Sequence, residues 1–190
     1  MNNRIAVIAA LPAIMEEIED VNAKWHVNPD GTPKPRDEEF ETRCVLLMKS
    51  ELMEAFEGIR KDNQPDSHLP QYPTESVEMI DLFIRSLDFI VFSDNEHITN
   101  SVYMSIADLS PNIFEYNAES KIIVYGVIDS VLTKIYDEPE WIVAIPNMII
   151  DYCDKFDIPL MEIYRAKMDY NKNRADHKLD ARNAVGGKKF

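Results

Sequence analysis

The stretch from residue 74 to residue 92, TESVEMIDLFIRSLDFIVF, decides the fold that this sequence predicts. Its apolar residues recur at intervals of three and four positions, which is the spacing of one face of an α-helix. The residues expected to face a core are Val77, Ile80, Phe83, Ile84, Leu87 and Val91. Thr74 stands where a helix cap is expected. We therefore predict a long amphipathic helix over residues 74–92 that packs against other helices.

Helical spacing continues through most of the remaining chain. Further helices are predicted over residues 12–25, 37–61, 98–109, 120–137, 139–156 and 159–174. The segment from Lys121 to Tyr125 could also form a strand, and we interpret it as part of a helix. Residues 26–36 and 62–73 contain prolines and polar residues, so both are predicted to be loops. The chain contains only five glycines, too few for the tight turns of a many-stranded sheet.

A length of 190 residues suits one domain, and no long linker divides the chain. We therefore expect residues 1–190 to form a single all-α domain built as a helical bundle. No apolar run approaches the roughly 18 residues that would span a bilayer. The apolar run from Ile5 to Leu11 resembles the start of a signal peptide, but Pro12 interrupts it. Two cysteines, Cys44 and Cys153, are too few for a disulfide framework, so we expect a cytoplasmic protein with free thiols.

The charge of the chain is strongly negative and unevenly distributed. It totals −14, from 20 basic and 34 acidic side chains. Such a surface argues against membrane association and against stable nucleic-acid binding. Residues 165–190 hold eight basic and three acidic side chains, a balance of +5, which leaves −19 for residues 1–164. This basic end, including a C-terminal tail over residues 175–190, could dock on the acidic body or hold an anion beside bound cations.

Two pairs of acidic residues lie within strongly apolar predicted helices. They are Glu51 and Glu54 in one helix, and Glu78 and Asp81 in the next. Residues three apart lie on one face of a helix, with Cβ atoms roughly 5–6 Å apart. Antiparallel packing of the two helices would bring four carboxylates together, and their repulsion would then require protons or cations. Hard oxygen ligands of this kind favour Mg²⁺, with Mn²⁺ as an alternative.

Other interpretations of these residues remain open at this point. Acidic residues at the same spacing occur elsewhere in the chain, so a solvated helix face is the alternative for any single pair. A ferritin-like di-iron site needs Glu-x-x-His pairs, and no histidine here follows a glutamate at that spacing. The histidines also lack zinc-ligand spacing with the cysteines, and we interpret them as surface or capping residues. They are His26, His68, His97 and His177.

A basic face is predicted on the helix over residues 159–174. Lys167, Asn171 and Arg174 are four and three residues apart, so an ammonium, an amide and a guanidinium share one side. Such a face can bind phosphate oxygens, for which arginine is the better two-pronged donor. The alternative is a solvated helix end whose cations oppose the negative end of the helix dipole.

Taken together, these segments resemble the MazG-like, all-α nucleoside triphosphate pyrophosphohydrolases. The metal motif of that family is Glu-x-x-Glu followed, after a spacer, by Glu-x-x-Asp. The matching residues here are Glu51, Glu54, Glu78 and Asp81, with 23 residues between the two pairs. Members often end in a Lys-x-x-x-Asn-x-x-Arg segment and a Gly-Lys tail. Lys167, Asn171 and Arg174 fit that segment, and Gly187-Lys188 fits the tail loosely.

The resemblance covers residues ~15–90 and ~147–190. Residues 91–146 are longer than the corresponding part of the compact members, so we expect a family-specific helical insertion there. Two residues depart from the pattern. Ser50 stands where many relatives have another Glu, and Ala175 stands where Pro usually follows the arginine. Both departures limit what the resemblance implies about substrate preference.

The resemblance implies Mg²⁺-dependent hydrolysis of a (deoxy)nucleoside triphosphate to the monophosphate and pyrophosphate. It implies that the four motif carboxylates hold the metal, and that Glu51 or Glu54 accepts a proton from the attacking water. It also implies that Lys167 and Arg174 bind the outer phosphates, and that Asn171 binds a phosphate or the sugar.

Two further residues are expected beside the site. Trp25 is the candidate for stacking on the base, with a tryptophan at the edge of the core as the alternative. Arg85 follows Asp81 by one helical turn and is expected to orient a carboxylate rather than to bind substrate.

Two other functions are compatible with the sequence. One is a catalytically silent helical protein that binds a partner through its acidic surface. The other is a metal-dependent phosphohydrolase acting on a modified or signalling nucleotide. Apolar helix faces in such bundles are often completed by association, so we also predict a homodimer or a higher homo-oligomer.

Overall fold

The structure is a computed structural model that describes residues 2–28, 30–93, 95–107 and 120–174. Over these ranges the chain forms helices and no strand, which confirms the predicted all-α class. The helices are α1 (Asn3–Asn22), α2 (Glu38–Arg60), α3 (Thr74–Phe92), α4 (Glu96–Ala107), α5 (Lys121–Lys134), α6 (Ala144–Lys155) and α7 (Leu160–Asn173), with the 3₁₀ turns η1 (Ala23–Trp25) and η2 (Pro139–Val143). None of the described helices is long and apolar enough to cross a membrane. The predicted tail over residues 175–190 lies outside the described residues.

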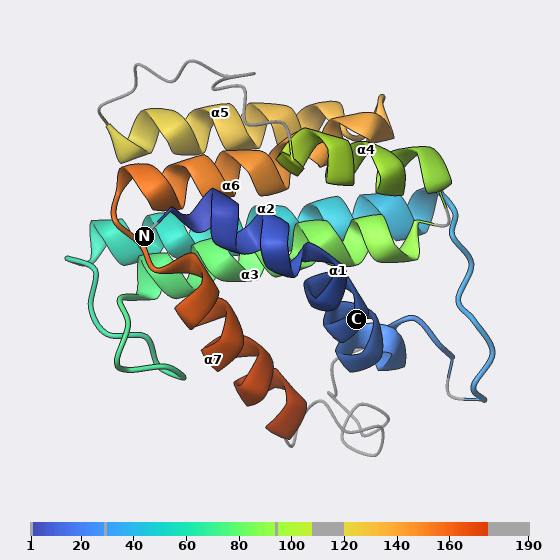
Figure 1. The fold of residues 1–190 in the computed structure, drawn as a ribbon, viewed down its shortest axis with the longest axis horizontal. Helices are drawn as coiled ribbons and strands as arrows, with labels where there is room; N and C mark the ends of the chain where they lie inside the picture. The colour runs from blue at the N-terminus through green and yellow to red at the C-terminus, as the bar shows by residue number, and fades with distance from the viewer. Residues whose placement is uncertain (1, 29, 94, 108–119, 175–190) are drawn as a thin grey trace.

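Helix α3 is the centre of the fold. It packs antiparallel to α2, and α1, α6 and α7 also contact it. Figure 1 shows α2 and α3 side by side, α5 and α6 stacked along one side of this pair, and α7 running obliquely away from it. Fourteen of the nineteen residues of α3 are buried, including polar ones. Any carboxylate that α3 carries toward a neighbouring helix is therefore removed from bulk water.

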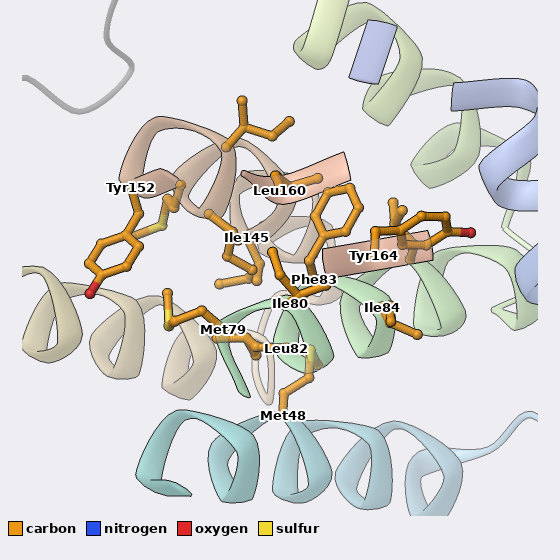
Figure 2. Packing of buried hydrophobic residues seen from close by; sticks show 14 of the residues in the cluster. Met48, Met79, Ile80, Leu82, Phe83, Ile84, Ile145, Tyr152, Leu160 and Tyr164 are labelled. Carbon is orange, nitrogen blue, oxygen red and sulfur yellow. The ribbon is translucent and has the colours of Figure 1, made fainter. Parts of the chain in front are cut away.

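The core is built from the apolar faces that the helical spacing predicts. Of the residues predicted to face the core from residues 74–92, all are buried except Val91, which is half-buried. Side chains from α2, α3, α6 and α7 meet in this core, as Figure 2 shows around Met48, Phe83, Ile145 and Tyr164. Phe83 and Tyr164 contact edge to face, with ring centroids 6.5 Å apart. This contact packs α7 against α3.

The first helix begins earlier than the prediction of residues 12–25. It starts at Asn3, after Asn2 accepts a hydrogen bond from the backbone N–H of Ile5. Pro12 lies inside α1 at an exposed position. Because proline has no N–H, one helical hydrogen bond is absent there and the helix is expected to bend. Figure 1 shows that α1 bends partway along its length. The apolar residues before Pro12, including the buried Val7 and Leu11, pack in the core and extend the helix.

Two other local predictions differ from the structure in detail. Thr74 is the first residue of α3 rather than its cap, and its hydroxyl donates to the carbonyl of Gln64 at 2.9 Å. The segment predicted as one helix over residues 139–156 is divided into η2 and α6. The segment from Lys121 to Tyr125 is helical, as predicted, and begins α5.

Gly58→Ala is expected to lower the free energy of unfolding by about 1–3 kcal/mol. A Cβ atom at Gly58 would lie only 2.8 Å from the backbone nitrogen of Glu75, where α2 passes close to α3. Gly126→Ala in α5 is the matched control, because no atom lies within 4 Å of a Cβ placed there. That change should stabilise the protein by roughly 0.5–1 kcal/mol. Urea unfolding followed by circular dichroism measures both, and equal effects would contradict the close contact of α2 with α3.

Candidate metal centre

Three carboxylates converge where α2 packs antiparallel to α3. They belong to Glu51 and Glu54 of α2 and Glu78 of α3, and one oxygen from each lies within 4.8 Å of the others. Glu51 and Glu78 are buried, whereas Glu54 is exposed. The group therefore lies at the edge of the core, with one side reached by solvent. Three of the four carboxylates in the two predicted acidic pairs therefore lie close together.

Asp81, the fourth predicted metal ligand, is placed differently. Its carboxylate does not belong to the group of three and instead pairs with Lys167 of α7, with 2.7 Å between Oδ2 and Nζ. Asp81 follows Glu78 by three residues on the same face of α3, so it borders the group. The structure thus brings three of the four predicted ligands together and gives the fourth a protein cation as its partner.

Glu78 is the most unusual member of the group. Only 7% of its surface is exposed, and its carboxylate lies beside those of Glu51 and Glu54. Buried polar groups in proteins are normally hydrogen-bonded, and a buried charge without a partner is costly. Burial raises the pKa of Glu78 to about 8, and the neighbouring carboxylates of Asp81, Glu51 and Glu54 add to the rise while Lys167 opposes it. A divalent cation bound here would offset the repulsion among these carboxylates.

Glu51 is held by Arg85, as the sequence predicts. The Nε of Arg85, one turn beyond Asp81 on α3, donates to Oε1 of Glu51 at 3.1 Å. Burial raises the pKa of Glu51 to about 7, Arg85 opposes this rise, and Asp81 and Glu54 add to it. Arg85 donates to only one oxygen of Glu51, Oε1. Arg85 therefore fixes the orientation of a carboxylate that could bind a metal.

The predicted basic face of α7 starts inside this region. Lys167 is buried against Asp81, Asn171 one turn later is half-buried, and Arg174 lies at the C-terminal cap of α7. The guanidinium of Arg174 lies 5.3 Å from the ring centroid of Tyr170. Lys167 is the residue of this face that pairs with Asp81. Asn171 and Arg174 follow Lys167 by four and seven residues along α7.

Trp25 lies in η1, beyond the end of α1, and is half-buried.

His26, the residue after Trp25, forms a buried ion pair that the sequence does not predict. His26 is buried, and its Nε2 lies 3.1 Å from both carboxylate oxygens of Asp88. The prediction of a surface residue is wrong for His26, whereas the alternative of a capping residue holds, because His26 is the C-cap of η1. Its partner Asp88 is 62 residues away, so no local spacing could have revealed the pair.

The neighbours of His26 indicate which of its two ring nitrogens carries the proton. Nδ1 lies 3.1 Å from Nη1 of Arg36, which can only donate, so Nδ1 accepts. The Nε2–H then donates to Asp88, and the imidazole ring stacks on Phe92 with centroids 3.6 Å apart. Asn22 also donates to Asp88, at 2.8 Å. This network fixes the loop after α1 to the helix that carries Glu78, and it leaves no free ring nitrogen on His26 for a ligand.

Metal binding at the group of three carboxylates is expected to strengthen as pH rises. In the metal-free protein, the pKa values of Glu51 and Glu78 are raised to about 7 and about 8, so both carboxyls hold protons in mildly acidic solution. A cation must displace these protons, so Mn²⁺ affinity should rise by roughly tenfold or more between about pH 6 and pH 8. Calorimetry in two buffers of different ionisation enthalpy measures both the affinity and the protons released. Binding that is independent of pH and releases no proton would contradict this expectation.

Comparison with family models, with curated proteins and with solved structures finds no match to this chain. The function of the site is therefore argued from its geometry and its residue types.

Proposed function

We propose that this chain is a Mg²⁺-dependent hydrolase that converts a (deoxy)nucleoside triphosphate to the monophosphate and pyrophosphate. The observation that carries the proposal is the convergence of the carboxylates of Glu51, Glu54 and Glu78, of which Glu51 and Glu78 are buried. Such a group of hard oxygen ligands suits a small divalent cation. The resemblance of the two acidic motifs to those of MazG-like pyrophosphohydrolases supplies the reaction.

The residues present fit a magnesium site. Three carboxylate oxygens lie close enough to bind one ion, and the exposed side at Glu54 leaves room for a substrate to approach. Bound Mg²⁺ would supply charge neutralisation at the phosphate oxygens and would make an attacking water more acidic. Arg85 holds Glu51 in place, and Glu54, which faces solvent, is the group placed to accept a proton from that water. Phosphoryl transfer depends mainly on such positioning and charge compensation.

The basic face of α7 suggests how the triphosphate of the substrate would be oriented. Lys167 lies beside Asp81, and Arg174 follows it by seven residues on the same side of the helix. Seven residues of α-helix span about 10 Å, which is comparable to the length of a triphosphate. We propose that the phosphates extend from the acidic residues along α7 toward Asn171 and Arg174. The half-buried Trp25 is retained as the proposed base-stacking residue.

We also propose that the protein forms a homodimer or a higher homo-oligomer. Large apolar side chains are exposed on α2 and on the adjacent α5, namely Leu46, Met53, Ile122 and Ile123. The two helices are joined by Lys49 and Asp129, whose charged atoms lie 2.6 Å apart. Burial of these apolar side chains by a second copy would favour association. Light scattering measures the mass, and a 22.0 kDa monomer in the presence of Mg²⁺ and nucleotide would contradict this proposal.

Product analysis tests the proposed reaction. The purified chain is incubated with a panel of dNTPs and NTPs in Mg²⁺, and the products are separated by ion-exchange chromatography. We expect monophosphate and pyrophosphate in equal amounts, and no products when the metal is chelated. Inorganic phosphate in place of pyrophosphate would indicate a different phosphohydrolase. An inert chain on every nucleotide, including modified ones, would favour a silent interaction protein.

A further inference from the structure

The loop that joins α2 to α3, residues 61–73, lies against α7. Its residue His68 packs on Tyr170 of α7, with ring centroids 4.9 Å apart. In the same loop, the hydroxyl of Tyr72 donates to the carboxylate of Glu162 on α7 at 2.7 Å. The loop therefore forms a wall beside the helix that carries the basic face.

The backbone at His68 is held by a buried carboxylate. Asp66 is only 3% exposed, and its Oδ1 accepts hydrogen bonds from the backbone N–H groups of His68 and Leu69, at 2.9 and 2.8 Å. Leu69 is buried in the core, which anchors the loop next to His68. His68 itself is exposed. A solvent-facing side chain on a fixed backbone is the arrangement that a binding residue requires.

Tyr170 places His68 beside the basic face of α7. Successive residues of an α-helix are rotated by about 100°, so Tyr170 and Asn171 lie on opposite flanks of the line from Lys167 to Arg174. The ring centroid of Tyr170 lies 5.3 Å from the guanidinium carbon of Arg174 and 6.0 Å from Nζ of Lys167. One aromatic ring is therefore close to both cations and to the imidazole of His68.

The chemistry of this flank suits a phosphate oxygen. Asp81 already pairs with Lys167, so a triphosphate lying along α7 gains from further donors. Histidine can supply one. The Oγ of Ser67 lies 3.4 Å from Nδ1 of His68. When this hydroxyl donates, the proton of the neutral imidazole is on Nε2, which is then a donor for an anion.

We propose that His68 binds a phosphate oxygen of the substrate from the loop side of α7, opposite Asn171. This inference rests on the proposed function, and it adds a substrate-binding residue that lies outside both acidic pairs and the basic segment. The phosphates then extend from Lys167 toward Arg174, with a donor on each flank. Tyr170 supports the imidazole from behind.

Calorimetric titration of the full chain with tripolyphosphate in excess Mg²⁺ tests this role without a nucleobase. His68→Ala should weaken binding by about tenfold, because one charge-assisted hydrogen bond is lost. His68→Arg restores a charged donor and should bind within about threefold of the wild type. His97→Ala is the matched control, because His97 is an exposed histidine on α4, and it should bind as the wild type does.

The results separate the role of His68 from the proposed function. Unchanged binding by His68→Ala would overturn the role, and so would equal weakening by His68→Ala and His68→Arg, which would indicate a purely structural ring contact. Weaker binding of nucleosides by His68→Ala, with unchanged binding of tripolyphosphate, would assign His68 to the base and also overturn it. If the wild type still releases pyrophosphate from a nucleoside triphosphate, the proposed function stands in each of these cases. A wild type that binds no tripolyphosphate overturns the role of His68, and one that also hydrolyses no nucleotide overturns the proposed function itself.

Discussion

Glu78→Gln is expected to lower kcat/KM by about 1,000-fold or more and, at the same time, to stabilise the metal-free protein. The change removes a carboxylate oxygen from the group that would hold the metal, so metal affinity and hydrolysis should fall together. It also removes a buried, repelled carboxylate, and the free energy of unfolding should rise by about 1–3 kcal/mol near pH 8. Opposite effects on activity and stability are typical of a residue kept for function.

The pH dependence of stability shows why Glu78→Gln should stabilise the metal-free protein. Because the pKa of Glu78 is raised from 4.5 to about 8, the folded chain holds more protons than the unfolded chain between these values. The free energy of unfolding of the metal-free protein should therefore fall as pH rises through this range, and Glu78→Gln should flatten the fall. Urea unfolding in chelator at several pH values measures this.

Glu57→Gln is the control for Glu78→Gln. Glu57 lies on α2 and pairs with Arg60 and Lys61 at the surface, outside the group of three carboxylates. We expect this variant to keep its activity and its stability within about 0.5 kcal/mol of the wild type. If Glu78→Gln retained full activity, or lost activity only because it unfolded, the assignment of Glu78 to the metal centre would be wrong.

Glu75→Ala is expected to have the largest effect on stability, lowering the free energy of unfolding by about 3–5 kcal/mol. Glu75 is only 1% exposed, three residues before Glu78 on the same helix. Its carboxylate accepts hydrogen bonds from Tyr152, from Lys121 at 2.7 Å and from Asn63 at 2.9 Å. Removing the carboxylate leaves all three donors without this acceptor, in or beside the core.

Thermal and urea unfolding measure the effect of Glu75→Ala. Glu162→Ala is the matched control, because the exposed carboxylate of Glu162 accepts a hydrogen bond from Tyr72 at 2.7 Å and lies at the surface. We expect that control to cost less than about 1 kcal/mol. Once folded, the Glu75→Ala variant should still bind Mn²⁺, since Glu75 does not belong to the metal group. A loss of less than about 1 kcal/mol would show that the network around Glu75 does not hold α5 and α6 to α3.

The contrast between Glu75 and Glu78 could not be read from the sequence. Both glutamates lie in the first turns of one apolar helix, and a helical spacing pattern treats them alike. Their difference arises from partners on α5 and α6, which lie 46 and 77 residues away along the chain. Local spacing predicts which residues share a face of a helix, whereas packing of distant helices decides which carboxylate is satisfied.

The long apolar helices were the most predictable part of the fold. The predicted bounds of residues 37–61 and 74–92 agree closely with α2 and α3, because both helices bury continuous apolar faces. The predicted first helix begins only at residue 12, because Pro12 interrupts the apolar run before it, whereas α1 begins at Asn3. In the structure, the apolar residues before the proline pack in the core and keep the helix continuous through it.

The candidate site was predictable in part for the same reason. The spacing of Glu51, Glu54 and Glu78 predicts their convergence once the two helices pack antiparallel, and the structure brings these three together. The pairing of Asp81 with Lys167 joins residues 86 positions apart, and nothing in the local pattern of either helix selects it. The sequence predicts Lys167 on a face that could bind phosphate, and the structure makes it the counter-charge to Asp81.

The most direct measurement is the anomalous scattering of crystals of this chain soaked in Mn²⁺. A peak within about 2.0–2.4 Å of carboxylate oxygens from Glu51, Glu54 and Glu78 is the result that the proposed metal centre requires. A map without a peak at these three carboxylates, at Mn²⁺ concentrations that saturate binding in solution, would contradict it.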